Sequence, residues 1–234
     1  MTDAEATFDL GSDWFNIEFE LRWLFQSSVF FKKMLTFENM SDIIQLKVTL
    51  DKTMPAIWRT IQVERNTTFF ELHHTLQIVF GWKNYHLYEF DIDGHKLGAP
   101  EDYMANIPST EEGVIDARDI TLDLIIEPGE TFSYMYDFGD SWKHIITVMK
   151  FLPKEQNIKY PICIDGELAC PPEDCGGIPG YYNMLEILKD KRNPEYKETK
   201  IWVGRNFKPE HFDKEKVNKK LLRLYKYIMD WLNG

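Results

Sequence analysis

The chain has 234 residues, of which 44% are hydrophobic and 15% aromatic, and it carries a formal net charge of −11 at neutral pH. This length and composition supply a packed core and indicate a globular protein. The negative charge repels phosphates, which makes nonspecific binding to nucleic acid or to an anionic membrane unfavourable. The acidic first residues and the lack of a long apolar stretch predict a cytoplasmic protein with no membrane association. Three cysteines, an odd number, do not make the disulfide framework of a secreted protein.

Residues 1–39 are expected to be an N-terminal extension of one main domain that spans residues 40–234. The segment "FNIEFELRWLF" alternates apolar and mainly polar residues, which is the period of a strand with one buried face. The segment "MSDIIQLKVTL", from Met40, is typical of the first strand of a domain. We therefore expect residues 40–234 to fold without the extension, because they contain a complete set of strands and helices.

The main domain is predicted to combine antiparallel hairpins with helices in an α+β fold. Residues 44–50 and 55–63 alternate as two strands of one hairpin. A helix over residues 69–80 follows, because a capping box precedes its apolar period. A strand with an Asp-Gly turn, a second hairpin and a short helix come next. The chain closes with a helix over residues 213–232 that packs by one apolar stripe.

The stretch "YDFGDSWKH" places carboxylates, an imidazole and an indole at the tip of the second predicted hairpin. If Gly139 and Asp140 are the central residues of a type II′ turn, Asp137 lies opposite Trp142. Asp137, Trp142 and His144 then share one face, where an ion or a proton can link the carboxylate to the imidazole. The stretch is therefore a metal or acid–base set, a recognition surface, or a tip that only has to turn.

A second dense stretch, "YPICIDGELACPPEDCGGIPGYYNML", is rich in proline and glycine, which predicts an irregular loop. Its three cysteines, Cys163, Cys170 and Cys175, can bind zinc if His144 or a carboxylate of the loop completes the usual four ligands. The spacing lacks a CxxC pair, and we favour the alternative of reduced cysteines buried as small apolar side chains. We expect the loop to fold back toward the hairpin tip, because its acids and thiols then meet other polar groups.

These motifs resemble those of the plasmid pRiA4b Orf-3-like family, whose members are also labelled as passenger proteins of transposable elements. The resemblance follows the chain in order over residues 43–220, and "YDFGDSW" and "ACPPEDCGG" are its most specific pieces. It implies an α+β roll of antiparallel hairpins packed with helices, and it implies no established biochemical activity. The resolvase-like name of some members does not extend to this chain, because its sequence has no serine or tyrosine recombinase constellation.

The sequence leaves three functions open. The preferred one is a noncatalytic binding or adaptor domain of mobile genetic elements, whose partner recognises the hairpin tip and the cysteine loop. The alternatives are a metal-dependent hydrolase or nuclease that uses the Asp/His cluster with a divalent metal, and a structural zinc domain that uses the cysteines. The candidate patch comprises Asp137, Asp140, Trp142, His144, Asp165, Glu173 and Asp174.

Overall fold

The structure is a computed structural model that describes residues 42–99, 113–124 and 127–233, all of which belong to one compact unit. Its frame is an eight-stranded sheet with the strand order β5-β4-β3-β6-β7-β1-β2-β8. Neighbouring strands are antiparallel except β4 and β5, which are parallel. The strands are β1 (Ile43–Leu50), β2 (Ile57–Glu64), β3 (Tyr88–Ile92), β4 (His95–Gly98), β5 (Ile115–Asp116), β6 (Thr131–Tyr136), β7 (Trp142–Leu152) and β8 (Ile162–Glu167).

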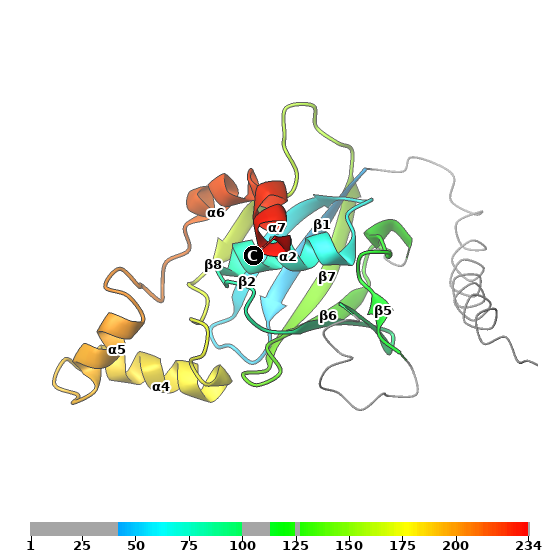
Figure 1. Ribbon diagram of the computed structural model, residues 1–234. Coiled ribbons are helices and arrows are strands. Elements are labelled where there is room, and N and C mark those ends of the chain that lie inside the picture. The colour runs from blue at the N-terminus through cyan, green and yellow to red at the C-terminus, as the bar shows by residue number, and fades with distance from the viewer. Residues whose placement is uncertain (1–41, 100–112, 125–126, 234) are drawn as a thin grey trace, which may run out of the picture. The chain divides into compact units, whose positions relative to one another are not determined.

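The described residues also form helices around this sheet (Figure 1). They are α2 (Phe69–Phe80), α4 (Gly177–Lys189), α5 (Tyr196–Trp202), α6 (Lys214–Leu221) and α7 (Leu224–Leu232), with a short 3-10 helix at Leu122–Leu124. Figure 1 shows α2 across the sheet with α6 and α7 beside it, and α4 and α5 together at one end. This arrangement confirms the predicted α+β fold of antiparallel hairpins packed with helices.

Helix α2 begins and ends where the sequence signals predict. The Thr68 hydroxyl accepts a hydrogen bond from the Glu71 N–H at 3.1 Å, and the Glu71 carboxylate accepts one from the Thr68 N–H at 2.9 Å. These reciprocal bonds satisfy amide groups that the start of the helix leaves free. At the other end Gly81 has φ +86°, a left-handed conformation that glycine adopts without strain. The chain then turns toward residues 82–86, which carry part of the candidate site.

The face of the sheet that packs against α2 holds the aromatic core. Phe69 of α2 makes edge-on contacts with Phe90 and Phe132, with ring centres 5.1 and 5.8 Å away. Tyr134 and Tyr136 lie on the same buried face of β6. Because large aromatic side chains bury the most apolar area, this face supplies a major part of the stabilising burial.

Arg59 of β2 is a charged residue inside this core, with 1% of its surface exposed. Its guanidinium donates hydrogen bonds to the backbone carbonyl groups of Trp58, Val79, Glu167 and Leu168. The Phe212 ring centre lies 3.8 Å from the guanidinium carbon, which adds a cation–π contact. Burial lowers the pKa of Arg59 by removing water from the charged group. Arg59 thereby joins β2 to α2 and to the end of β8.

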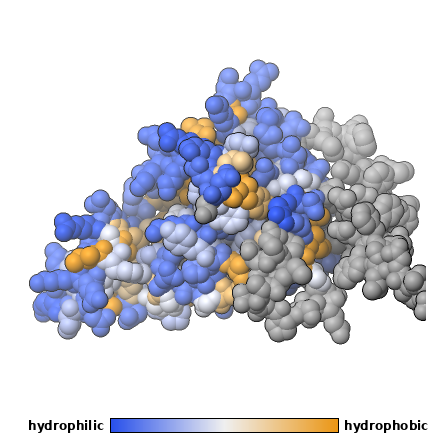
Figure 2. Space-filling view, in the orientation of Figure 1, coloured by the Kyte–Doolittle hydropathy of each residue, from blue (hydrophilic) through white to orange (hydrophobic). Residues whose placement is uncertain are grey.

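The helix predicted over residues 213–232 is in fact two helices, α6 and α7. Asp213 caps α6 as expected, because its carboxylate accepts a hydrogen bond from the Lys216 N–H at 2.9 Å. The helix breaks at Leu222 and Arg223, which lets α6 contact β8 and α2 while α7 contacts α2. Figure 2 shows apolar residues over α7 within a mainly hydrophilic face. The exposed apolar residues of this region are Leu222, Tyr225, Met229, Trp231 and Leu232.

The described residues include no helix that is both long and apolar enough to cross a membrane. Their first residue, Asp42, immediately precedes β1. The N-terminal extension over residues 1–39 lies outside the described residues, so its predicted dispensability stays a prediction.

Candidate functional site

The hairpin of β6 and β7 has a longer tip than the sequence analysis predicts. Tyr136 pairs with Trp142, so residues 137–141 form the loop. The predicted two-residue turn, which paired Asp137 with Trp142, is wrong by one position in the register. The physical reason lies in the buried face, because the observed register keeps the aromatic residues of both strands on it. A slip of the register by one residue would turn the aromatic residues of β6 or those of β7 toward solvent.

Asp137 organises the hairpin loop instead of pairing with a strand residue. Its backbone has φ +57°, and its Oδ1 atom accepts hydrogen bonds from the N–H groups of Gly139 and Asp140 at 2.9 and 3.2 Å. A carboxylate that binds the backbone two residues ahead is a common way to stabilise a turn. Asp137 is only 7% exposed, and its second oxygen, Oδ2, faces His86.

The cysteine loop meets the hairpin loop, which confirms that prediction. The Gly176 N–H donates a hydrogen bond to the Asp140 carboxylate at 3.2 Å. Gly177 approaches the same residue so closely that a Cβ atom on it would lie 2.6 Å from the Asp140 carbonyl oxygen. The close approach and the φ of +65° at Gly177 both require glycine. The two most distinctive motifs of the sequence therefore share one surface.

A third segment, residues 82–86 between α2 and β3, completes this surface. The Trp82 indole N–H donates a hydrogen bond to the Pro171 carbonyl at 3.0 Å. The Lys83 N–H donates to the Glu173 carboxylate at 2.9 Å. Both bonds connect the segment to the cysteine loop, so three segments that are distant in the sequence are held together.

Tyr136 connects the same segments through hydrogen bonds of its hydroxyl group. Its hydroxyl donates a hydrogen bond to Glu173 Oε1 at 2.6 Å and accepts one from the Tyr85 N–H at 3.1 Å. Burial and the neighbouring Glu173 carboxylate raise the pKa of Tyr136, which keeps the hydroxyl protonated as a donor. The other Glu173 oxygen, Oε2, is buried and has no hydrogen-bond partner among the described residues.

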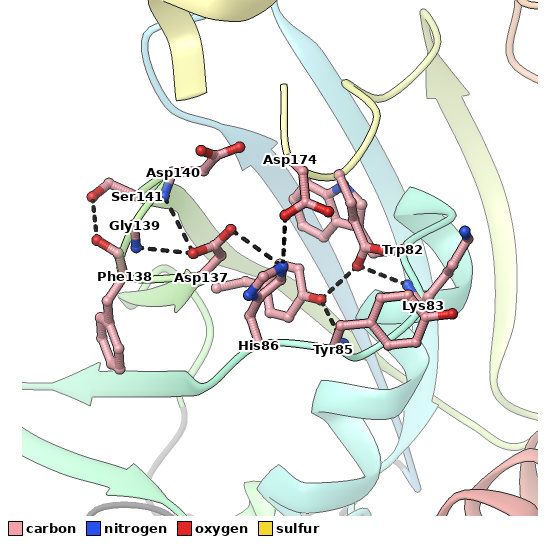
Figure 3. Close-up of polar contacts among 12 residues, drawn as sticks. Trp82, Lys83, Tyr85, His86, Asp137, Phe138, Gly139, Asp140, Ser141 and Asp174 are labelled. Carbon is pink, nitrogen blue, oxygen red and sulfur yellow. Dashed lines mark hydrogen bonds and ion pairs between the residues drawn. The ribbon is translucent and has the colours of Figure 1, made fainter. Parts of the chain in front are cut away.

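His86 lies where the three segments meet (Figure 3). Its Nε2 atom is 3.1 Å from Asp174 Oδ1 and 3.6 Å from Asp137 Oδ2. The three ligand atoms lie within 4.8 Å of one another. The side chains of Asp174 and His86 are 67% and 31% exposed, so the cluster is open to solvent on the Asp174 side. An imidazole between two carboxylates can ligate a metal ion or, when protonated, form two ion pairs.

A buried polar network holds the segment that carries His86. The Nε2 atom of His73 is 2.6 Å from Asn84 Oδ1, and its Nδ1 atom is 2.8 Å from the Tyr134 hydroxyl. Because an amide oxygen only accepts, Nε2 carries the proton and the Tyr134 hydroxyl donates to Nδ1. Gln77 accepts the Asn84 N–H at 2.9 Å, which supports the left-handed φ of +60° at Asn84. Burial lowers the pKa of His73 well below its ordinary value, so the ring is neutral.

Two residues of the predicted patch, Trp142 and His144, lie in the core instead of at the loop surface. His144 has no exposed surface, and its ring centre is 4.6 Å from that of Phe80 and 5.2 Å from that of Trp82. Neither of its ring nitrogens has a hydrogen-bond partner among the described residues, and burial lowers its pKa to about 3. The expected alignment of Asp137 with His144 on one strand face is wrong, because Asp137 belongs to the loop and turns to His86.

The cysteines are divided between two places. Cys163 lies on the edge strand β8 together with Asp165, whereas Cys170 and Cys175 lie in the loop. Burial raises the pKa of Cys163 to about 11 and that of Cys175 to about 12, and it raises the pKa of Cys170 well above its ordinary value. All three are therefore thiols at neutral pH. Within the described chain, no three ligand atoms of these cysteines and His144 gather as the His86 cluster does.

His86 is the site residue that the sequence motifs did not single out. A signal for it lies in the pairing of β3 with β6, because the Asp137 N–H donates to the Leu87 carbonyl at 2.9 Å. A prediction of that strand pair would have placed His86 beside Asp137. The contact with Asp174 depends on the path of an irregular loop, for which the sequence has no comparable signal.

The fold and the site define an α+β domain with a histidine–carboxylate cluster among three interlocked loops. A family model described as plasmid pRiA4b ORF-3-like protein matches residues 42–216, and the chain belongs to this family. The chain is 34% identical over 167 residues to the uncharacterized protein y4hQ of Sinorhizobium fredii (strain NBRC 101917 / NGR234), which covers 70% of this chain and 82% of the relative. It is also similar to the crystal structure of MM3350, a protein of unknown function from Methanosarcina mazei Go1. That likeness has a TM-score of 0.66 at 35% identity and covers 76% of this chain and 98% of the other.

Proposed function

We propose that the protein is a noncatalytic binding or adaptor domain whose recognition surface is formed by the three loops. We call this surface the loop patch, and it consists of Tyr85, His86, Asp137, Phe138, Asp140 and Asp174. The observation that carries the proposal is the interlocking of the loops through bonds such as Gly176 to Asp140 and Lys83 to Glu173. Loops held in place by a rigid sheet are common sites of binding residues, because ordering them on binding costs little.

The composition of the loop patch suits a protein partner. Tyr85 is 70% exposed and Phe138 is 41% exposed, and Figure 3 shows them on either side of His86. Exposed aromatic residues beside charged groups are typical of the residues that dominate binding energy in protein interfaces. The acidic groups of the patch and the net charge of −11 favour a partner with a basic surface and disfavour nonspecific nucleic-acid binding.

The two alternative functions have less support from the geometry. A hydrolase or nuclease built on His144 requires a ring that reaches substrate or metal, yet this ring is enclosed by Phe80 and Trp82. A zinc domain built on the cysteines requires several ligand atoms close together, and among the described residues the candidate metal-binding group contains no cysteine. A cytoplasmic location and a role in mobile genetic elements remain parts of the proposal, and the second is motivated by the family.

The proposal is tested by affinity capture from cells that naturally encode the protein. The bait is the full chain in three forms: the wild type, the double variant Tyr85→Ala/Phe138→Ala, and the control Ile201→Ala/Trp202→Ala on α5. Ile201 and Trp202 are 71% and 50% exposed, so the control removes a comparable apolar surface elsewhere. We expect the wild type and the control to enrich the same protein, and the loop-patch variant to retain less than a tenth of it. Equal enrichment by all three baits, or no enrichment by the wild type, would contradict the proposal.

A further inference from the structure

We propose that His86, Asp137 and Asp174 bind a divalent transition-metal ion of the zinc type. The inference rests on the proposed function in one respect, because this cluster is the centre of the loop patch. One imidazole and two carboxylates form a ligand set that zinc and related divalent ions accept. The ligands differ from those that the sequence predicts, since His86 takes the place of His144 and the cysteines have no part.

The distances between the ligand atoms fit such an ion. Tetrahedral zinc has bonds of about 2.0 to 2.1 Å to nitrogen and oxygen, which places neighbouring ligand atoms about 3.3 Å apart. His86 Nε2 is 3.1 Å from Asp174 Oδ1 and 3.6 Å from Asp137 Oδ2, on either side of this value. The third separation, between the Asp137 and Asp174 oxygens, lies within 4.8 Å, and Asp174 is the exposed member, so its side chain has room to turn toward the other two ligands.

Asp137 supplies an independent argument. Only 7% of the residue is exposed, and its Oδ1 atom is held by two N–H groups of its own loop. Its Oδ2 atom accepts no hydrogen bond from the residues that the structure describes, and it faces His86 Nε2. Oδ2 is not among the fully buried side-chain atoms that lack a hydrogen-bond partner, so solvent reaches this atom and a cation can take the place of that solvent. The fold thus presents a fixed acceptor atom to the position that the metal ion would take.

The charge around the cluster also favours a cation. Among the ion pairs of the described residues, Asp137 and Asp174 have only His86 as a partner. The Asp140 carboxylate accepts a hydrogen bond from the Gly176 N–H of the cysteine loop, which also carries Asp174. In the same loop, the buried Glu173 Oε2 has no hydrogen-bond partner in the described chain. A divalent ion neutralises this excess of carboxylates, and it requires the neutral form of the imidazole.

Three protein ligands leave a coordination position open. In zinc proteins such a position is taken by water or by a group of the bound molecule. The Asp174 side of the cluster is exposed to solvent, so a donor atom of a partner can reach the ion from there. The metal ion would then strengthen recognition at the loop patch through a direct bond to the partner.

The test is isothermal titration calorimetry of the full-length, chelator-treated protein with zinc chloride at pH 7.5. The variants are His86→Gln and Asp174→Asn, and the control is His211→Gln, which removes an exposed histidine outside the cluster. We expect one zinc ion per chain in the wild type and the control, and at least a tenfold weaker affinity in both cluster variants. Circular dichroism at the same pH verifies that the variants are folded.

Several outcomes overturn the inference. They are an absence of zinc binding by the wild type, an equal affinity in all four proteins, and a loss of binding in Cys170→Ser/Cys175→Ser that His86→Gln does not reproduce. Zinc binding and partner capture are separate readouts. Zinc binding that depends on His86 and Asp174 supports the metal site even where capture fails, and that failure contradicts the adaptor function alone. Capture without zinc binding overturns the metal site and leaves the adaptor function in place.

Discussion

Gly177 stands against Asp140 so closely that a Cβ atom at position 177 would lie 2.6 Å from the Asp140 carbonyl oxygen. This contact closes the cysteine loop onto the hairpin loop. We expect Gly177→Ala to lower the free energy of unfolding by about 3 kcal/mol, because it adds left-handed backbone strain and overpacking. The midpoint and slope of urea denaturation, followed by tryptophan fluorescence, measure this loss.

Gly94→Ala is the matched control for Gly177→Ala. Gly94 has φ +90°, but no heavy atom lies within 4 Å of its Cβ position. Its substitution therefore introduces the backbone strain without the steric clash, and we expect a loss of about 1 kcal/mol. Equal losses of unfolding free energy in the two variants would show that the Asp140 carbonyl moves aside at little cost and that the two loops are not tightly packed.

Stability is expected to fall as the pH is lowered, because buried histidines must stay neutral in the folded chain. Burial lowers the pKa of His144 to about 3 and that of His74 to about 4, against an ordinary value of about 6.5 in the unfolded chain. Between about pH 6.5 and pH 3 the unfolded chain therefore binds more protons than the folded one. The free energy of unfolding is thus highest above pH 6.5, and it declines by roughly several kcal/mol as the pH falls from about 6.5 to about 3.

His144→Phe separates the contribution of His144 from that of other acid-sensitive groups. The variant keeps an aromatic ring beside Phe80 and Trp82 and removes two buried nitrogens that have no hydrogen-bond partner among the described residues. We expect urea denaturation to give nearly unchanged stability at pH 7.5 and a smaller loss than the wild type at pH 5. The same loss at pH 5 in both proteins would contradict a depressed pKa of His144.

Arg59 is expected to be one of the most sensitive positions of the core. Arg59→Met removes the donors of four backbone carbonyl groups and leaves them buried, which we expect to cost about 3 to 5 kcal/mol. The control is Arg192→Met, because the Arg192 side chain is 92% exposed and its loss is expected to stay within about 0.5 kcal/mol. Chemical denaturation compares the two, and similar losses would mean that the buried guanidinium contributes little to the core.

The main domain is expected to fold without the N-terminal extension. Expression of residues 40–234 is expected to give a soluble protein that unfolds cooperatively, with a melting temperature within a few degrees of the full chain. Differential scanning calorimetry of both chains makes the comparison. An insoluble product, or a melting curve without a cooperative transition, would show that the apolar segment "FNIEFELRWLF" belongs to the core.

Local sequence signals were sufficient for the elements whose stabilising contacts are themselves local. The capping box of Thr68 and Glu71 acts within one helical turn, and the hairpin of β1 and β2 follows from alternation along two adjacent strands. The length of the β6–β7 tip was not predictable from turn residues alone, since it is set by the burial of Trp142 and His144 with their strand partners. The length of the tip is predictable from the sequence only if His144 is treated as a core residue.

The candidate site was predictable in part for the same reason. The two loops were recognisable as dense polar motifs, and their meeting was expected, whereas the contact between Asp140 and Gly176 that joins them was not. The central His86 was missed, because its place beside Asp137 follows from the pairing of β3 with β6, which was not predicted, and its contact with Asp174 depends on an irregular loop. The role of Arg59 was hidden as well, because an arginine within an alternating strand gives no sign that backbone carbonyls from other elements surround it.

We propose that the three loops converge on one metal-binding recognition site. This proposal is tested most directly by a crystal structure of the full chain grown with zinc, with anomalous diffraction data collected at the zinc edge. We predict one strong anomalous peak about 2.0 to 2.2 Å from His86 Nε2, Asp137 Oδ2 and Asp174 Oδ1. A peak at the cysteines, or no peak within bonding distance of His86, would contradict it.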